Sequence, residues 1–268
     1  MKFLFSEIAL FQAVFLRSII TVPPVLLMVW VTKVTLRNLA KQDIRLIWLR
    51  VGAEICTTVA FLTALKYMPL ANVTAILQAL PLAVTMAAAL FLSEPIGWRR
   101  WSAILVGFLG VLIVVRPGLD GFNVYSLSAL AAIIFITVRE IATRKLAQEV
   151  PTITVVLSTA IGSAVFSGIM MIGAEWHTVS TSSWLLLIGA AFAVLIATLL
   201  SVMAMRTGEI GFVSPFRYTS MLGAIGLGIL MFGEWPDQLT LAGTLIIVIT
   251  GIYTFHREQK VSRGVTAS

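Results

Sequence analysis

Long apolar runs separated by short polar stretches make up most of the chain. Each run has about the 20 residues that a helix needs to cross the hydrocarbon core of a bilayer. None shows the apolar–polar alternation of a transmembrane β-strand. The pattern therefore predicts an all-α, polytopic membrane protein. The nine predicted spans lie at about 8–32, 44–66, 71–92, 101–117, 123–145, 153–173, 183–203, 212–232 and 239–255.

The composition agrees with a chain that lies mostly in lipid. Of the 268 residues, 59% are hydrophobic and 12% are charged, which is about half the charged fraction of a soluble domain. The net charge of +7 comes from basic residues between the apolar runs, so it indicates membrane orientation rather than nucleic-acid binding. The single cysteine, Cys56, lies inside an apolar run. We expect no disulfide, no metal site and no cofactor.

Basic residues concentrate in every second loop. They follow the first, third, fifth and seventh predicted spans and the last one, as with the pairs Arg99 and Arg100, and Arg144 and Lys145. Because Lys and Arg are enriched on the cytoplasmic side of a membrane protein, these loops and the C-terminus are predicted to be cytoplasmic. With nine spans, the N-terminus is then predicted to lie outside.

A weak internal repeat divides the chain. Residues 64–73 align with residues 204–213, and Glu94 aligns with Glu234 in the same register. Basic residues follow Glu94, whereas the loop after Glu234 has no Lys or Arg, so the two copies are predicted to face opposite sides of the membrane. Inverted repeats of this kind are typical of transporters that bind substrate near the midplane. We predict five-helix repeats at 1–118 and 119–256 and a cytoplasmic tail at 257–268.

The second repeat begins with the span at 123–145, and its counterpart in the first repeat would precede residue 1. We therefore expect a ten-helix fold of which this chain lacks the first helix. A misplaced start codon is the preferred hypothesis, and a nine-helix protein is the alternative. An apolar segment of about 20 residues in frame upstream would support the first.

Short motifs occur in a characteristic order along the spans. Arg17 lies in a Phe-Leu-Arg-Ser run, Lys66-Tyr-Met-Pro-Leu-Ala-Asn-Val73 opens the third span, and Glu94-Pro95 and Glu234-Trp-Pro236 follow the third and eighth. In order, spacing and twofold occurrence the chain resembles the EamA-type members of the drug/metabolite transporter superfamily over nearly its whole length. The stretch Pro215-Phe-Arg-Tyr-Thr-Ser220 resembles a bacterial subgroup that includes S-adenosylmethionine and riboflavin carriers. The resemblance implies ten helices around a central cavity in a bacterial inner membrane.

Charges inside a span cost free energy and call for a function or a partner. Arg17 and Arg217 have no charged counterpart in the other repeat, which favours contact with a substrate because a guanidinium grips a carboxylate or phosphate with two hydrogen bonds. Tyr218, Gln78 and Asn72 are further substrate-binding candidates. We predict that Arg17→Ala and Arg217→Ala abolish transport without preventing insertion.

A second group of charges suggests coupling or gating. Arg50 and Glu54, four residues apart on one helical face, are predicted to form an ion pair, with Arg50 reaching toward the cytoplasmic end. Arg139 and Glu140 lie deep in the fifth span, where Arg139 can pair with Glu54 or Glu140 or extend toward the span end at Arg144. Glu94 and Glu234 lie at span ends, where binding of loop amides or closing of a gate is favoured over contact with substrate. Pro23, Pro24, Pro81 and Pro215 lie within apolar runs and are predicted to bend their helices.

The function favoured by these patterns is carriage of a small organic metabolite by alternating access, such as riboflavin, S-adenosylmethionine or an amino acid. A drug or metabolite efflux pump of the same fold is the alternative, followed by a membrane-embedded enzyme or a non-transporting subunit. No H-E-x-x-H or G-x-S-x-G motif occurs in the sequence, so we expect no enzyme. The expected partners are the small-molecule substrate and the lipid bilayer, for a monomer or homodimer.

Overall fold

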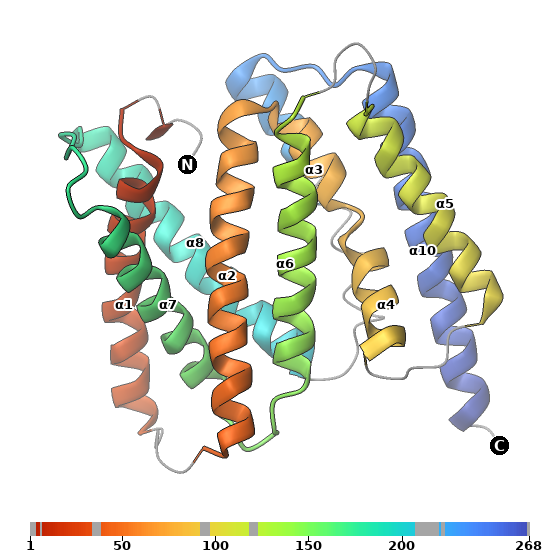
Figure 1. Cartoon of the computed structure of the whole chain (residues 1–268), viewed down its shortest axis with the longest axis horizontal. Helices are drawn as coiled ribbons and strands as arrows, with labels where there is room; N and C mark the ends of the chain where they lie inside the picture. Colours follow the sequence, from red (N-terminus) through yellow and green to blue (C-terminus); the bar gives the residue numbers. More distant parts are fainter. Residues whose placement is uncertain are drawn as a thin grey trace. The chain divides into compact units, whose positions relative to one another are not determined.

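The computed structural model describes residues 4–5, 7–33, 39–91, 97–117, 123–206, 220 and 223–266, with the backbone alone for 255–266. Within these ranges the chain is helical and contains no strand (Figure 1). The helices are α1 (Leu10–Thr32), α2 (Lys41–Tyr67), α3 (Leu70–Leu77), α4 (Leu80–Phe91), α5 (Trp98–Val115), α6 (Ser126–Arg144), α7 (Thr152–Met170), α8 (Thr181–Arg206) and α10 (Gln238–Thr266). A further apolar helix, Gly223–Phe232, precedes α10.

The predicted membrane spans are present as helices. Seven segments are long and apolar enough to cross a bilayer: Leu10–Thr32, Lys41–Tyr67, Leu70–Phe91, Trp98–Val115, Ser126–Arg144, Thr152–Met170 and Thr181–Arg206. Two shorter apolar helices, Gly223–Phe232 and Gln238–Thr254, lie within the last two predicted spans. The prediction of an all-α, polytopic membrane protein is therefore confirmed.

Prolines act differently in two of the helices. The predicted third span is interrupted at Gln78 and Ala79, where α3 ends and α4 begins (Figure 1). Pro81 explains the break, because it lacks an N–H and its ring collides with the carbonyl of Leu77, four residues earlier. Pro23 and Pro24 lie inside α1 without ending it. Of these two proline sites, Pro81 therefore interrupts its helix, whereas Pro23 and Pro24 do not.

The described helices form two compact units, each made of two separate stretches of chain. Unit 1 comprises Met1–Leu62 and Val138–Gly208, and unit 2 comprises Thr63–Thr137 and Glu209–Ser268. Each unit thus takes helices from both predicted repeats. In unit 1, α1 packs against α7 and α8 (Figure 1). An apolar core between α1, α2, α7 and α8, with residues such as Val25, Val51 and Val156, holds them together.

In unit 2, α5 and α10 pack along each other (Figure 1), and two glycines allow the close approach. A methyl group on Gly243 would lie 2.6 Å from the backbone oxygen of Gly110 and 2.7 Å from a methyl carbon of Val114. A methyl group on Gly110 would lie 2.8 Å from the backbone oxygen of Gly243. Small residues at helix contacts let backbones approach in this way within a membrane.

We expect Gly243→Ala to lower the thermal stability of the detergent-purified protein. The added methyl group has to push a backbone carbonyl away, which costs about 1–3 kcal/mol in a packed interior. Gly189→Ala in α8 is the matched control, because no atom lies within 4 Å of its added methyl group. The stability of that variant should equal that of the parent or exceed it by up to about 1 kcal/mol, because alanine has a higher helix propensity than glycine. Equal melting temperatures for Gly243→Ala and the parent would contradict the close packing.

Asp237 fixes the start of α10 in unit 2. Its carboxylate accepts a hydrogen bond from the backbone N–H of Thr240 at 2.7 Å, which caps the helix, and another from the Arg116 guanidinium. The Arg116 hydrogen bond lowers the pKa of Asp237 from 3.8 to about 2. The stabilisation is therefore complete above the ordinary pKa and is lost only as the pH falls toward 2.

Candidate functional site

Five charged side chains lie together within unit 1. Arg17 comes from α1, Arg50 and Glu54 from α2, and Arg139 and Glu140 from α6. The exposed fraction is 9% for Arg17 and 2% for both Arg50 and Glu140. All five lie well inside helices that are long enough to cross the membrane, where a charge requires a partner or a function.

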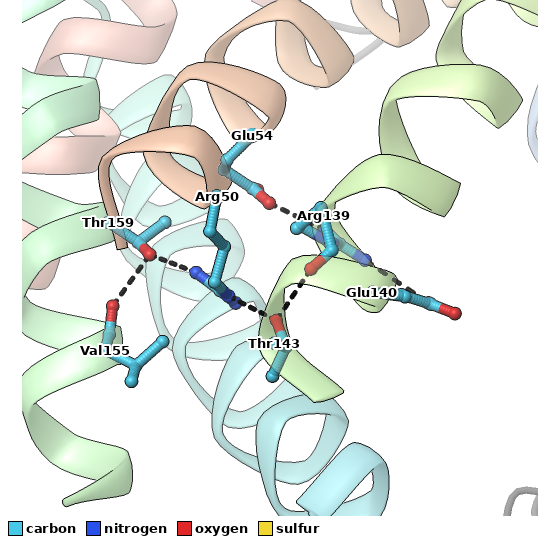
Figure 2. Close-up of polar contacts among 7 residues, drawn as sticks. All are labelled: Arg50, Glu54, Arg139, Glu140, Thr143, Val155 and Thr159. Atoms are coloured by element: carbon cyan, nitrogen blue, oxygen red, sulfur yellow. Dashed lines mark hydrogen bonds and ion pairs between the residues drawn. The ribbon is translucent and has the colours of Figure 1, made fainter. Parts of the chain in front are cut away.

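Arg139 is the residue that both carboxylates share. Its guanidinium lies 2.6 Å from the Glu54 carboxylate and 3.6 Å from the Glu140 carboxylate (Figure 2). The Glu54 and Arg139 side chains are 14% and 18% exposed, so this ion pair is largely excluded from water. Both partners that the sequence suggested for Arg139 are therefore used at once.

Arg50 is held by hydroxyl groups instead of a carboxylate. Its Nε donates to Thr143 Oγ1 at 2.8 Å and its Nη1 donates to Thr159 Oγ1 (Figure 2). Each hydroxyl in turn donates a hydrogen bond to a backbone carbonyl one turn back on the same helix: Thr143 to Arg139 and Thr159 to Val155. The hydrogen bonds of Arg50 are thus partly satisfied, but these acceptors are neutral and leave its charge without a paired anion.

The predicted ion pair between Arg50 and Glu54 is wrong. Residues four apart share a helical face, but Glu54 reaches Arg139 on α6 and forms its ion pair there. Arg50 also does not extend to the helix end, because its side chain is buried against α6 and α7. A threonine on each of those helices offered it a nearer acceptor than the solvent.

A cavity opens beside this cluster, wholly within unit 1. Its volume is about 30 Å³, which is about the volume that one water molecule takes in the liquid. Its walls come from four helices: Arg17, Ser18 and Thr21 from α1, Glu54 from α2, Val156, Thr159, Ala160 and Ser163 from α7, and Val194, Leu195 and Thr198 from α8. A polar cavity of this kind, part way along membrane-spanning helices, is suited to binding a polar solute inside the bilayer.

Three predicted site residues lie in unit 2. The Asn72 side-chain oxygen accepts a hydrogen bond from Thr240 at 3.4 Å, and the Gln78 amide donates to Ser220 at 3.4 Å. The Glu234 carboxylate accepts the backbone N–H of Leu70 at 2.8 Å, at the start of α3. These contacts link α3 to the C-terminal part of the chain. Arg217, Tyr218 and Glu94 lie outside the described residues, and their roles stay predictions.

The hydroxyl residues of α7 were not among the predicted site residues. Thr159 and Ser163 line the cavity, and Ser167 follows one turn further along. Their spacing of four residues puts them on one face of the helix. This polar stripe inside an apolar span is the signal in the sequence that would have found them.

The fold and the cavity together define a polytopic helical membrane protein with a polar, partly charged site inside its helical bundle. This is the architecture of a membrane carrier. The family model of the EamA-like transporter family matches residues 1–116 and again residues 124–255, and the chain belongs to this family.

Several characterised bacterial proteins are similar to the chain. It is 30% identical over 217 residues to the riboflavin transporter of Vibrio cholerae, covering 80% of this chain and 72% of that protein. It is 27% identical over 198 residues to the S-adenosylmethionine uptake transporter of Rickettsia conorii, covering 73% and 66%. It is 26% identical over 216 residues to a pseudopaline exporter of Pseudomonas aeruginosa, covering 80% and 76%.

A solved crystal structure shares the fold. It superposes with a TM-score of 0.68 at 20% identity, over 91% of this chain and 88% of the other. At this identity the likeness supports the helical arrangement alone.

Proposed function

We propose that the chain carries a small organic metabolite across a bacterial inner membrane and binds it in the unit 1 cavity after the helices around the cavity have moved apart. The observation that carries this proposal is the origin of the cavity walls. Helices α1 and α2 belong to the first predicted repeat, and α7 and α8 belong to the second. A site lined by both members of an inverted repeat can open to either side when one repeat moves against the other.

The proposed orientation places the C-terminal tail in the cytoplasm. It rests on the concentration of Lys and Arg in alternate loops, because such residues are enriched on the cytoplasmic side. Relatives are named both as uptake transporters and as an exporter. Export of a metabolite or drug is therefore the alternative direction of transport that we propose for this chain. The transporters among the relatives favour carriage over a membrane enzyme or a non-transporting subunit.

Riboflavin and S-adenosylmethionine are the first substrates to test, because they are the substrates named for two relatives. The full chain is reconstituted into liposomes, and the flux of each labelled compound is measured in both directions. Saturable flux of either compound above that of empty liposomes supports the proposal. If neither these compounds nor a wider metabolite panel gives protein-dependent flux, carriage by this chain is excluded.

The same liposomes separate proton coupling from facilitated exchange. Glu54 and Glu140 are the carboxylates of the cluster that a coupling proton would use. Glu54, however, is engaged with Arg139 at 2.6 Å. We expect the flux to persist when an ionophore collapses the pH gradient, since this ion pair disfavours release of the carboxylate for protonation. Loss of flux on collapse of the gradient would instead establish proton coupling.

Filling the cavity should stop transport without changing any charge. Ala160 lies on the cavity wall, and we expect Ala160→Phe to reduce the flux by about tenfold or more, because the ring occupies space that the metabolite needs. A tenfold loss corresponds to about 1.4 kcal/mol of binding free energy. Ala197→Phe is the matched control, because Ala197 is exposed on α8. Its flux should stay close to that of the parent. Melting temperatures of both variants check that each is folded, and unchanged flux in folded Ala160→Phe protein would exclude this cavity.

A further inference from the structure

We infer that the metabolite carries an acidic group, a carboxylate or a phosphate, and that Arg17 binds this group in the unit 1 cavity. The inference rests on the proposed function, which leaves the chemical class of the metabolite open. It follows from the balance of charges around the cavity and from the polar side chains on its wall that have no hydrogen-bond partner within the described ranges of the chain.

The charge balance leaves a guanidinium without an anion. Among the described residues the cluster holds three arginines and two glutamates, and Arg139 lies within 4 Å of both carboxylates. Arg50 is bound by two neutral hydroxyls. Arg17 forms no ion pair with Glu54, whose carboxylate is bound to Arg139. A buried charge without a close counter-ion is costly, so an anionic ligand would be strongly favoured here.

Several polar side chains on the cavity wall have no hydrogen-bond partner among the residues that the structure describes. Within the described part of the chain, four cavity residues make no side-chain hydrogen bond: Arg17, Ser18, Ser163 and Thr198. Three of them, Arg17, Ser18 and Ser163, are buried by the surrounding helices. A guanidinium has five N–H donors and no acceptor, and a hydroxyl can also donate. Glu54 is the charged acceptor on the wall, and it is engaged by Arg139.

An acidic group meets both requirements. It supplies the missing negative charge, and its oxygens accept several hydrogen bonds at once, two of them from a single guanidinium. A cationic group would instead add to the positive charge of the cluster. The apolar wall of Val156, Ala160, Val194 and Leu195 is left for the uncharged part of the metabolite.

The test uses two pairs of ligands in which only the acidic group differs. S-adenosylmethionine is compared with decarboxylated S-adenosylmethionine, and riboflavin 5′-phosphate with riboflavin. Binding to the purified full chain is measured by calorimetry. In at least one pair the acidic member should bind about tenfold more tightly, since hydrogen bonds to charged groups contribute about 1.5–3 kcal/mol. A preference within the S-adenosylmethionine pair indicates a site for a carboxylate, and a preference within the riboflavin pair indicates a site for a phosphate.

The preference should depend on Arg17. In Arg17→Gln the acidic member should lose its advantage, whereas Arg45→Gln should keep it, because Arg45 is exposed on α2. Ser163→Ala provides a milder variant should Arg17→Gln fail to fold. It should weaken the acidic member by about threefold to tenfold and leave its partner unaffected.

The outcomes separate this inference from the proposed function. Absence of a preference in both pairs, whether all four compounds bind or none does, overturns the acidic-group assignment. A preference that survives in folded Arg17→Gln overturns the role of Arg17. Flux of riboflavin with no preference for its phosphate would leave transport standing, whereas acid-selective binding without any flux would remove transport and keep the anion site.

Discussion

Glu54→Gln is expected to destabilise unit 1 by about 3 kcal/mol, because removing one partner of a buried ion pair leaves the other charge uncompensated. The partner left behind is Arg139, which the Glu54 carboxylate contacts at 2.6 Å. Glu140, at 3.6 Å from the same guanidinium, would be the one carboxylate left among three arginines. The measurement is unfolding of the detergent-purified protein by heat or by titration with a denaturing detergent.

A double variant separates the ion pair from other effects of Glu54. Glu54→Gln combined with Arg139→Gln should recover part of the lost stability, since both partners of the 2.6 Å ion pair are then removed together. The recovery is partial because Glu140 loses its 3.6 Å contact with Arg139. Glu149→Gln is the control, because Glu149 is exposed in unit 1 and exposed charges contribute little. Glu54→Gln protein as stable as the parent, or a double variant with the sum of both losses, would contradict a mutually stabilising pair.

Arg17→Gln is expected to reduce transport by about 100-fold, since truncating one partner of a buried charged hydrogen bond costs about 2–5 kcal/mol. The loss should lie mainly in kcat/KM, because the residue acts on the bound metabolite. The side chain forms no ion pair with the described residues, so stability should change less than in Glu54→Gln. This contrast between transport and stability distinguishes a binding residue from a structural one.

Arg17→Lys tests the geometry of the interaction. Lysine keeps the positive charge but loses the planar fork that binds a carboxylate or phosphate with two parallel hydrogen bonds. We expect partial recovery of transport relative to Arg17→Gln, with a raised KM. Transport equal to the parent in folded Arg17→Gln protein would show that the metabolite does not use this arginine, and Arg217→Ala would then become the next variant to measure.

The membrane spans and the candidate charges could be predicted from the sequence. Hydrophobicity summed over about 20 residues is a local property, and the helices lie where the apolar runs predicted them. The cost of a charge in lipid is local as well. It identified Arg17, Glu54, Arg139 and Glu140, which the structure brings into one cluster.

The effect of each proline depended on its surroundings. Pro81 and the pair Pro23 and Pro24 look equivalent in the sequence, because every proline lacks an N–H and crowds the preceding turn. The chain breaks between α3 and α4 but continues through α1. Neighbouring helices can satisfy the carbonyls that a proline frees, and their positions are not encoded in the local pattern.

The sequence by itself determined which segments cross the membrane and which charged residues within them require a partner or a function, because a charge in lipid costs free energy. Only the tertiary structure decided the partners: Glu54 binds Arg139 instead of Arg50, and two threonines hold Arg50. It also placed Asn72 and Gln78 in unit 2, where they form hydrogen bonds with Thr240 and Ser220. The physical reason is that the free energy of placing a segment in lipid depends on the residues of that segment alone. A hydrogen bond or ion pair requires two atoms within about 3–4 Å, and helices distant in the sequence meet at that range only in the folded chain.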